Sequence, residues 1–162
     1  MTDDEILEAV RLSLVGRDVP APATGEKLAE AEGKIGYPMP LLLKRLYMEV
    51  ANGWVGPHMP TILGTMADPR VDALEDITSL FYEDGPDPGF PLSGLVQVGN
   101  WNGAVRSLVD FTDPSGLMWG IDNGAYFRES MTFREWIVMH VEGSLEAPLG
   151  RDHPESEYLW EL

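Results

Sequence analysis

Three aspartates beside predicted turns are the residues best placed to do chemistry. Asp110, Asp113 and Asp122 flank segments with the residue pattern of β-strands. If the turns bring them together, two of them could act as the acid and base of a hydrolytic reaction. Aspartate is also common at turns because its side chain accepts hydrogen bonds from nearby backbone N–H groups. We favour the structural role, and a carboxylate-dependent hydrolase is the distant alternative.

Other catalytic and metal-binding patterns find little support. The three histidines, His58, His140 and His153, have no metal-ligand spacing, and the chain contains no cysteine. There is no G-x-S-x-G nucleophile motif and no phosphate-binding glycine loop. The acidic run 83–87 lacks the spaced oxygens and the distal glutamate of a calcium loop. We therefore predict no enzymatic activity, no metal and no cofactor, and we expect His140 to be a packing residue.

A segment rich in acids is the better candidate for binding. If a helix over 71–81 buries Leu74 and Ile77, three acids fall on its exposed side and loop acids extend that surface. We predict that this surface attracts a basic protein, with two tryptophans as anchors, although either tryptophan is equally suited to the core. A plain solvated helix face is the alternative for the acids. The predicted partner-binding residues are Asp72, Glu75, Asp76, Glu83, Asp84, Asp87, Trp54 and Trp101.

Composition narrows the class of partner. The chain has 162 residues, 44% of them hydrophobic, which suits one domain with a real core. Its formal charge of −16 would repel nucleic acids and anionic membranes, and it would speed the approach of a basic protein. No apolar run reaches the roughly 20 residues that span a bilayer, and the first residues lack a secretory pattern. We expect a cytoplasmic protein.

The N-terminal half predicts three helices. The first covers 3–15. The second is capped by Thr24 or a neighbour and ends near Gly36, with a linker between the two helices. The third runs from Pro40 in its first turn to residue 51, and Asn52-Gly53 stops it. These helices have apolar faces made of Ile6, Leu7, Val10 and Leu14, of Leu28, Ala31 and Ile35, and of Leu42, Leu43, Leu46, Tyr47 and Val50.

The C-terminal half predicts a sheet and a closing helix. Antiparallel strands are expected at 95–98, 105–111 and 117–121, with a turn at 113–116 and a reversal at 122–124 before a short strand at 125–127. A short strand at 61–65, a helix over 68–81 that buries Phe81, and a loop at 83–94 precede them. Thr132 and Glu135 have the spacing of a capping box for the last helix, which ends near Gly143. An acidic tail, 147–162, contains Tyr158, Leu159 and Trp160, which either pack back or dock a partner.

The segment 32–57, EGKIGYPMPLLLKRLYMEVANGWVGP, resembles the signature of the SUKH superfamily, the Smi/Knr-type proteins. In that family E-x-x-L-G-x-x-L-P leads into a helix that ends at N-G, and G-P often follows in bacterial members. The matching residues here are Glu32, Ile35, Gly36, Met39, Pro40, Asn52, Gly53, Gly56 and Pro57. Their contribution to the local fold makes this motif structural rather than catalytic.

The resemblance continues through the predicted strands, over about residues 26–146. The family text N/D-W-G-C-A-x-W-S-x-V-D, then M-W, then D-x-N is matched by Trp101, Ala104, Ser107, Val109, Asp110, Met118, Trp119 and Asp122. Asn102-Gly103 stands in place of Gly-Cys and Arg106 in place of an aromatic residue, so any role of that turn does not carry over.

The resemblance implies a single α+β domain, 1–162, in which a mostly antiparallel sheet of four to six strands packs against helices. It also implies protein recognition, and bacterial members often neutralise toxins. We therefore predict an immunity protein that covers a cognate basic toxin, such as a nuclease, without covalent chemistry. A regulatory scaffold module of the same fold is the alternative. The sequence leaves the identity of the partner and the oligomeric state open.

Overall fold

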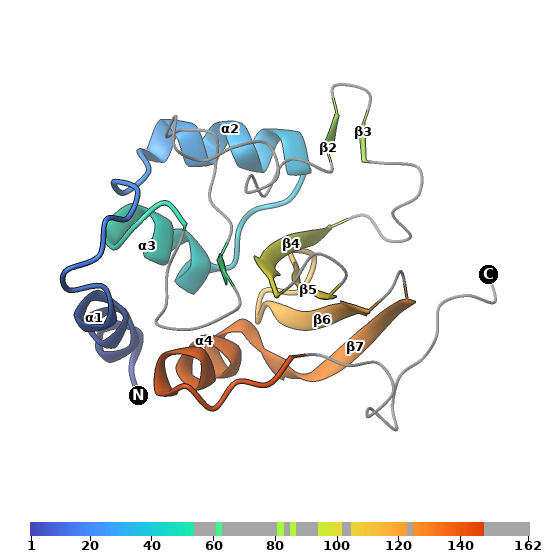
Figure 1. Cartoon of the computed structure of the whole chain (residues 1–162). Helices are drawn as coiled ribbons and strands as arrows, with labels where there is room; N and C mark the ends of the chain where they lie inside the picture. Colours follow the sequence, from blue (N-terminus) through green and yellow to red (C-terminus); the bar gives the residue numbers. More distant parts are fainter. Residues whose placement is uncertain are drawn as a thin grey trace.

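The computed structural model describes residues 1–53, 61–62, 81–82, 85–86, 94–101, 105–122 and 125–147. Figure 1 shows helices gathered on one side of an antiparallel sheet. The helices are α1 (Asp3–Ser13), α2 (Gly25–Ile35), α3 (Leu41–Glu49) and α4 (Phe133–Glu142). The main sheet contains β1 (Thr61–Ile62), β4 (Leu95–Asn100), β5 (Val105–Asp110), β6 (Leu117–Asp122) and β7 (Ala125–Thr132). The predicted α+β class is confirmed.

Hydrogen bonds at the helix ends explain where most of the helices begin and stop. The Thr24 hydroxyl accepts from the Lys27 N–H at the start of α2, and Gly36 ends that helix with φ +85°. Thr132 and Glu135 form the predicted reciprocal box at the start of α4, and Gly143 ends it with φ +71°. Glycine accepts this left-handed backbone without a steric penalty. These predicted boundaries are confirmed.

The boundaries of α3 differ from the prediction. Pro40 is the residue before the helix, with the extended values φ −51° and ψ 135°, and the helix itself starts at Leu41. It ends at Glu49 with Val50 as its cap, so Asn52 and Gly53 lie beyond the end and do not stop it. Asn52 is buried, and Gly53 has φ +91° in the segment that follows. The N-G pair therefore shapes the exit from α3 rather than its last turn.

The strands follow one another across the main sheet in the order β1-β4-β5-β6-β7, and all neighbours are antiparallel. The predicted turn after β5 is confirmed, because the Gly116 N–H donates to the Asp113 carbonyl at 2.8 Å. Asp122 pairs with Ala125, which confirms the reversal between β6 and β7. However, β7 continues to Thr132, well beyond the short strand predicted at 125–127, because its pairing with β6 extends along the whole of β6.

A second, two-stranded sheet changes the prediction for residues 81–86. Phe81 was expected at the end of a helix and residues 83–94 in a loop, but Phe81–Tyr82 (β2) pairs antiparallel with Gly85–Pro86 (β3). Only two residues separate these strands, which is the length of a tight hairpin reversal. Backbone pairing therefore replaces the last helical turn that apolar spacing predicted. The rest of the predicted helix, 68–80, lies outside the described residues.

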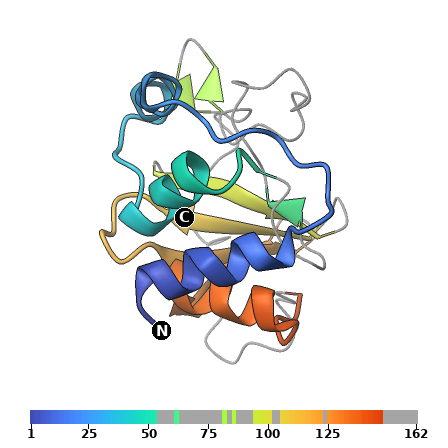
Figure 2. The same cartoon turned by 90° about the vertical axis from the view of Figure 1, so that its left-hand side faces the viewer.

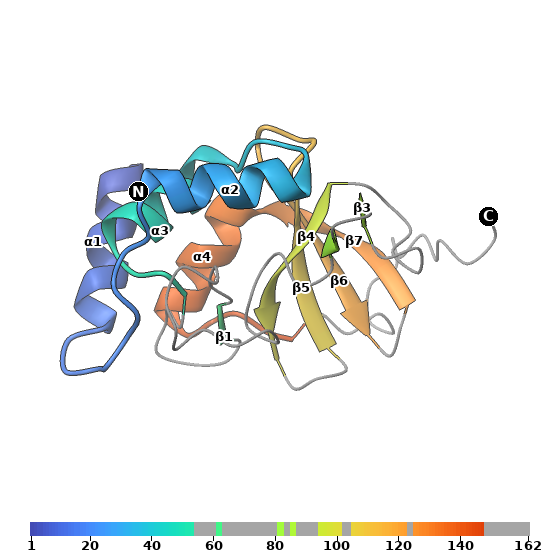
Figure 3. The ribbon, with the colours of Figure 1, turned by 90° about the horizontal axis from the view of Figure 1, so that it is seen from above.

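The main core lies between the helices and one face of the main sheet. Seen from above, the helices lie on one side and strands β4 to β7 on the other (Figure 3). In the view of Figure 2, α1 and α4 lie next to one another, and they are in contact. Buried side chains of all four helices join Val96, Val98, Val109 and Met118 of the sheet. The opposite face carries a smaller cluster of Leu95, Leu108 and Ile121, with Trp119 and Tyr126 beside it.

In the described part of the chain, every helix is too short or too polar to cross a membrane.

Candidate functional site

Glu32 joins α2 to the start of α3. Its Oε1 accepts from the Met39 N–H at 2.9 Å, and both carboxylate oxygens lie within 3.0 Å of Lys44 Nζ. Met39 precedes Pro40, the N-cap of α3, so this hydrogen bond fixes the chain as it enters the helix. The same carboxylate neutralises Lys44, a half-buried cation of α3. In this structure the glutamate of the signature holds two helices together.

Pro40 brings the start of α3 against the main sheet. A Cβ placed on Gly116, in the turn between β5 and β6, would lie 3.2 Å from Pro40 Cβ. The Gly116 carbonyl also accepts from the Phe133 N–H of α4 at 2.7 Å. This contact packs three distant parts of the chain around one turn. The motif residues Gly56 and Pro57 lie outside the described residues.

The outer side of α3 forms a surface that we call the α3 surface: Leu41, Lys44, Arg45 and Met48. Leu41 and Met48 are exposed and lie seven residues apart, so they share one side of the helix. Lys44 on one flank binds Glu32 of α2, and Arg45 on the other binds Asp4 of α1 at 2.7 Å. Two apolar side chains therefore stand between two sets of ion pairs.

Arg45 is the centre of the ion pairs between α1 and α3. Its Nε donates to Glu49 Oε1 at 2.7 Å, and its Nη2 donates to Asp4 Oδ1 at 2.7 Å. Hydrogen bonds to these carboxylates raise the pKa of Arg45 above its usual range, and the bond from Arg45 lowers the pKa of Glu49. Arg11 of α1 also approaches Glu49, at 3.6 Å. The cations on this side of the molecule already have anionic partners.

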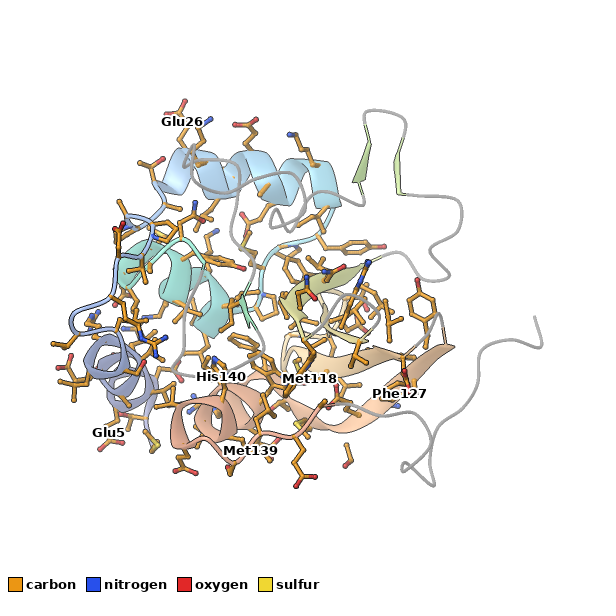
Figure 4. The ribbon with its side chains drawn as sticks, in the orientation of Figure 1. Glu5, Glu26, Met118, Phe127, Met139 and His140 are labelled. Carbon is orange, nitrogen blue, oxygen red and sulfur yellow. The ribbon has the colours of Figure 1, made fainter. Side chains whose placement is uncertain are left out.

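The same is true of other cations in the chain. All three lysines are in ion pairs, because Lys27 and Lys34 both approach Glu30 and Lys44 approaches Glu32. Arg134 of α4 binds Asp3 of α1. The exposed acids that have no basic neighbour therefore determine the electrostatic potential at the surface. Figure 4 shows two exposed acids, Glu5 and Glu26, pointing away from the body of the protein.

Trp101 is the predicted partner-binding residue that the structure describes. It follows β4, and its indole N–H donates to Ser107 Oγ of β5 at 2.9 Å. The Trp101 backbone N–H donates to the Val105 carbonyl at 3.0 Å, which closes the connection between the two strands. The ring is half-buried, so its polar atom serves the fold while part of the ring remains accessible. The other predicted partner-binding residues lie outside the described residues: Asp72, Glu75, Asp76, Glu83, Asp84, Asp87 and Trp54.

The three aspartates considered for catalysis do not converge. Asp110 Oδ1 accepts from the Thr112 N–H at 2.8 Å, and Asp113 Oδ1 accepts from the Ser115 N–H at 2.9 Å. The hydrogen bonds from Ser115 lower the pKa of Asp113. Asp122 pairs with Val105 at the opposite end of the β5–β6 hairpin. Strand register therefore separates Asp122 from the other two aspartates, and turn hydrogen bonds explain Asp110 and Asp113, in line with the structural role that we favour.

His140 has the packing role that the sequence predicts, and it is buried. Its ring stacks on Trp136 one turn earlier, with ring centroids 5.4 Å apart. Figure 4 shows His140 on α4, away from the sheet residues Met118 and Phe127. Within the described ranges, no group of three histidine or acidic side chains is arranged to hold a metal ion.

Sequence reasoning missed Glu129 on β7. This residue is only 4% exposed, and its Oε1 is buried without a hydrogen-bond partner. Burial raises the pKa of Glu129 to about 7, because water no longer stabilises the charged form. The alternation of Phe127, Glu129 and Met131 could have identified it, since a strand with Phe and Met on one side turns Glu129 to that side too.

Comparison of the chain with protein-family models and with curated proteins finds no match. The resemblance to the SUKH superfamily therefore stays a prediction that rests on the motif residues themselves.

Proposed function

We propose that this chain is a non-catalytic protein-binding module of the SUKH type, and that it is an immunity protein for a basic toxin. It would bind the toxin in the cytoplasm and cover its active surface. A nuclease suits this role best, because its cleft is built to attract phosphate and would be attracted by carboxylates in the same way. No bond is made or broken in such an action.

The observation that carries the proposal is the pattern of charge. Acids outnumber bases by 27 to 11, and all three lysines are in ion pairs with acids of this chain. A basic partner would therefore meet a surface with few repelling cations. Such complementarity acts mainly on the association rate, because it steers the partner before contact.

The affinity would come from apolar contacts inside the charged surroundings. Interface energy concentrates in a few well-packed side chains, among which tryptophan is frequent. Trp101 offers a ring that Ser107 already holds in position, so little conformational freedom would be lost on binding. We propose Trp101 as an anchor and the acids of 72–87 as the steering surface.

Co-expression with the toxin is the first test. The product of the reading frame beside this gene is expressed alone and with this protein, and cell survival and co-purification are scored. We expect protection and a complex. If the neighbour is harmless, or if no co-expressed toxin is neutralised, the immunity function is refuted, and the scaffold alternative is then tested with whichever partner co-purifies.

Association kinetics then test the role of charge. Neutralising Asp72, Glu75 and Asp76 together should lower the association rate constant by about tenfold at low salt, and the difference should shrink at high salt. The matched control neutralises three exposed acids elsewhere, Glu26, Glu142 and Glu146, and we expect it to change the rate less. Equal effects in both variants would show that only net charge matters and would refute the proposed surface.

A further inference from the structure

The sheet edge formed by β7 is interrupted by a bulge. In the described sheet β7 is an outermost strand and pairs with β6 alone. Leu117 pairs with Thr132 and Trp119 pairs with Arg128, so residues 129–131 all stand opposite Met118. Extra residues of this kind break the ladder of hydrogen bonds locally and bend the strand. The edge is therefore held less firmly at residues 129–131 than along the rest of β7.

Glu129 lies at the start of this bulge with its carboxyl group turned inward. It shares the side of β7 that carries Phe127, which is fully buried, and Met131, which packs against the main core. Its Oε1 has no hydrogen-bond partner. A buried carboxylate without a partner is unfavourable, and the same group becomes acceptable when it is protonated.

Few charged groups of the neighbouring elements face Glu129. On β6 the titratable residue of that face is Asp122, which pairs with Ala125, four residues before Glu129. On α4 the inward titratable residue is His140, which stacks on Trp136. The other charged residues nearby are exposed or interact elsewhere. Arg128, the residue before Glu129, is exposed, Arg134 binds Asp3, and Glu135 forms the capping box with Thr132. Desolvation is the cause that shifts the Glu129 pKa.

We propose that β7 is a proton-controlled edge of the sheet, closed while Glu129 is neutral and opened locally at the bulge when Glu129 ionises. The carboxylate reaches water by moving outward through the interrupted part of the ladder. This inference does not depend on the proposed function.

The size and direction of the effect follow from the two protonation equilibria. The carboxyl group has a pKa of about 7 when buried and an ordinary value of 4.5 when it reaches water. The open state is therefore favoured increasingly as the pH rises from 4.5 to 7, and the effect levels off above 7. Between pH 6 and pH 8 the equilibrium constant for opening should rise by about tenfold.

Hydrogen exchange of the whole chain tests the proposal. Amide exchange of β7 and β5 is followed by NMR at pH 6 and pH 8 with small additions of denaturant, and corrected for intrinsic exchange rates. We expect the β7 opening to grow about tenfold with pH and to respond little to denaturant, as a local opening does. The increase should vanish in Glu129→Gln and remain in Glu142→Gln, which removes an exposed acid of α4.

Two results would overturn the proposal. The first is β7 exchange that occurs only through global unfolding, with the same denaturant dependence as β5. The second is an unchanged pH response in Glu129→Gln. If that variant fails to fold, the carbon-13 titration of the Glu129 carboxyl in the unmodified protein decides, because a midpoint near 4.5 instead of about 7 removes the basis of the switch.

Discussion

Two partly or fully buried glutamates, Glu32 at the α2–α3 junction and Glu129 at the β7 edge, have opposite surroundings. Glu32 accepts from the Met39 N–H and is paired with Lys44, all within 3.0 Å. Glu129 is 4% exposed, and its Oε1 has no hydrogen bond. One glutamate therefore has hydrogen-bond donors on its carboxylate, whereas the other has a buried oxygen without a partner.

The comparison separates a structural carboxylate from one that responds to protons. A carboxylate that accepts several hydrogen bonds fixes the groups that donate to it. A carboxylate that has lost water without gaining a partner changes its protonation near neutral pH instead. The first kind of group makes the α2–α3 junction rigid, and the second makes the β7 edge sensitive to pH.

The largest expected effect comes from removing the charge at Glu129. Because its folded pKa of about 7 is above the ordinary 4.5, the native state holds the proton more tightly. The contribution of Glu129 to the free energy of unfolding is therefore largest below pH 4.5. It is lost as the pH rises from 4.5 through 7, and it stays low at higher pH. The free energy of unfolding of Glu129→Gln should therefore exceed that of the unmodified protein by about 3 kcal/mol at pH 8.5. At pH 5 the difference should be less than about 1 kcal/mol. Urea denaturation at both pH values measures the difference, and a constant difference would contradict the buried charge.

The second-largest effect is expected at Glu32, the glutamate whose carboxylate has hydrogen-bond donors. Glu32→Ala removes the acceptor of the Met39 N–H and leaves Lys44 without its anion, so we expect a loss of about 2 kcal/mol in the free energy of unfolding. Glu32→Gln keeps an oxygen that can accept from Met39 and should lose less. Denaturant unfolding of Glu32→Ala, of Lys44→Met and of the double variant that combines them gives the coupling energy. A coupling near zero would mean that the ion pair contributes nothing to the junction.

A smaller effect is expected where α3 meets the sheet. Gly116 has φ +65°, and an added Cβ would crowd Pro40 at 3.2 Å, so Gly116→Ala should destabilise the protein by about 1.5 kcal/mol. Gly33 in α2 is the matched control, because it has ordinary helical surroundings and open space. Gly33→Ala should stabilise by about 0.5–1 kcal/mol. Thermal unfolding of the two variants should shift in opposite directions, and shifts of the same sign would refute the contact.

The smallest effects are expected from the N-caps of α2 and α4, which lie in the two regions compared above. Thr24→Ala and Thr132→Ala each remove one hydroxyl that accepts a backbone N–H, and each should cost about 1 kcal/mol. Since Thr132 also ends β7, its loss should increase hydrogen exchange in β7, whereas Thr24→Ala should leave β7 unchanged. Exchange measured on both variants distinguishes them. Equal exchange in β7 would mean that the strand and α4 are not coupled through this cap.

Interactions between residues close in the chain were predictable here. The caps at Thr24, Gly36, Thr132 and Gly143 follow from hydrogen bonds that span at most a few residues. The Asp113 turn is local in the same way, and the strands around it follow from apolar patterning. For these elements the residue types and their spacing contain nearly all the information that the backbone needs.

Interactions between distant residues were not predictable. Periodicity could extend a helix to Phe81, but it could not show that Phe81–Tyr82 pairs with Gly85–Pro86. Turn preferences placed Asp110 and Asp122 near turns, but strand register put them at opposite ends of one hairpin. All six predicted partner-binding acids lie outside the described residues, so that surface remains a prediction.

The sequence alone determined the caps of α2 and α4, the strands on either side of the Asp113 turn and the strong negative charge of this protein. Only the tertiary structure decided which glutamate has donors and which has none. Glu32 meets Met39 and Lys44 because α2 and α3 fold back on each other, whereas Glu129 loses water because the fold buries that side of β7. Burial and partners depend on residues far apart in the chain, and no local pattern contains them.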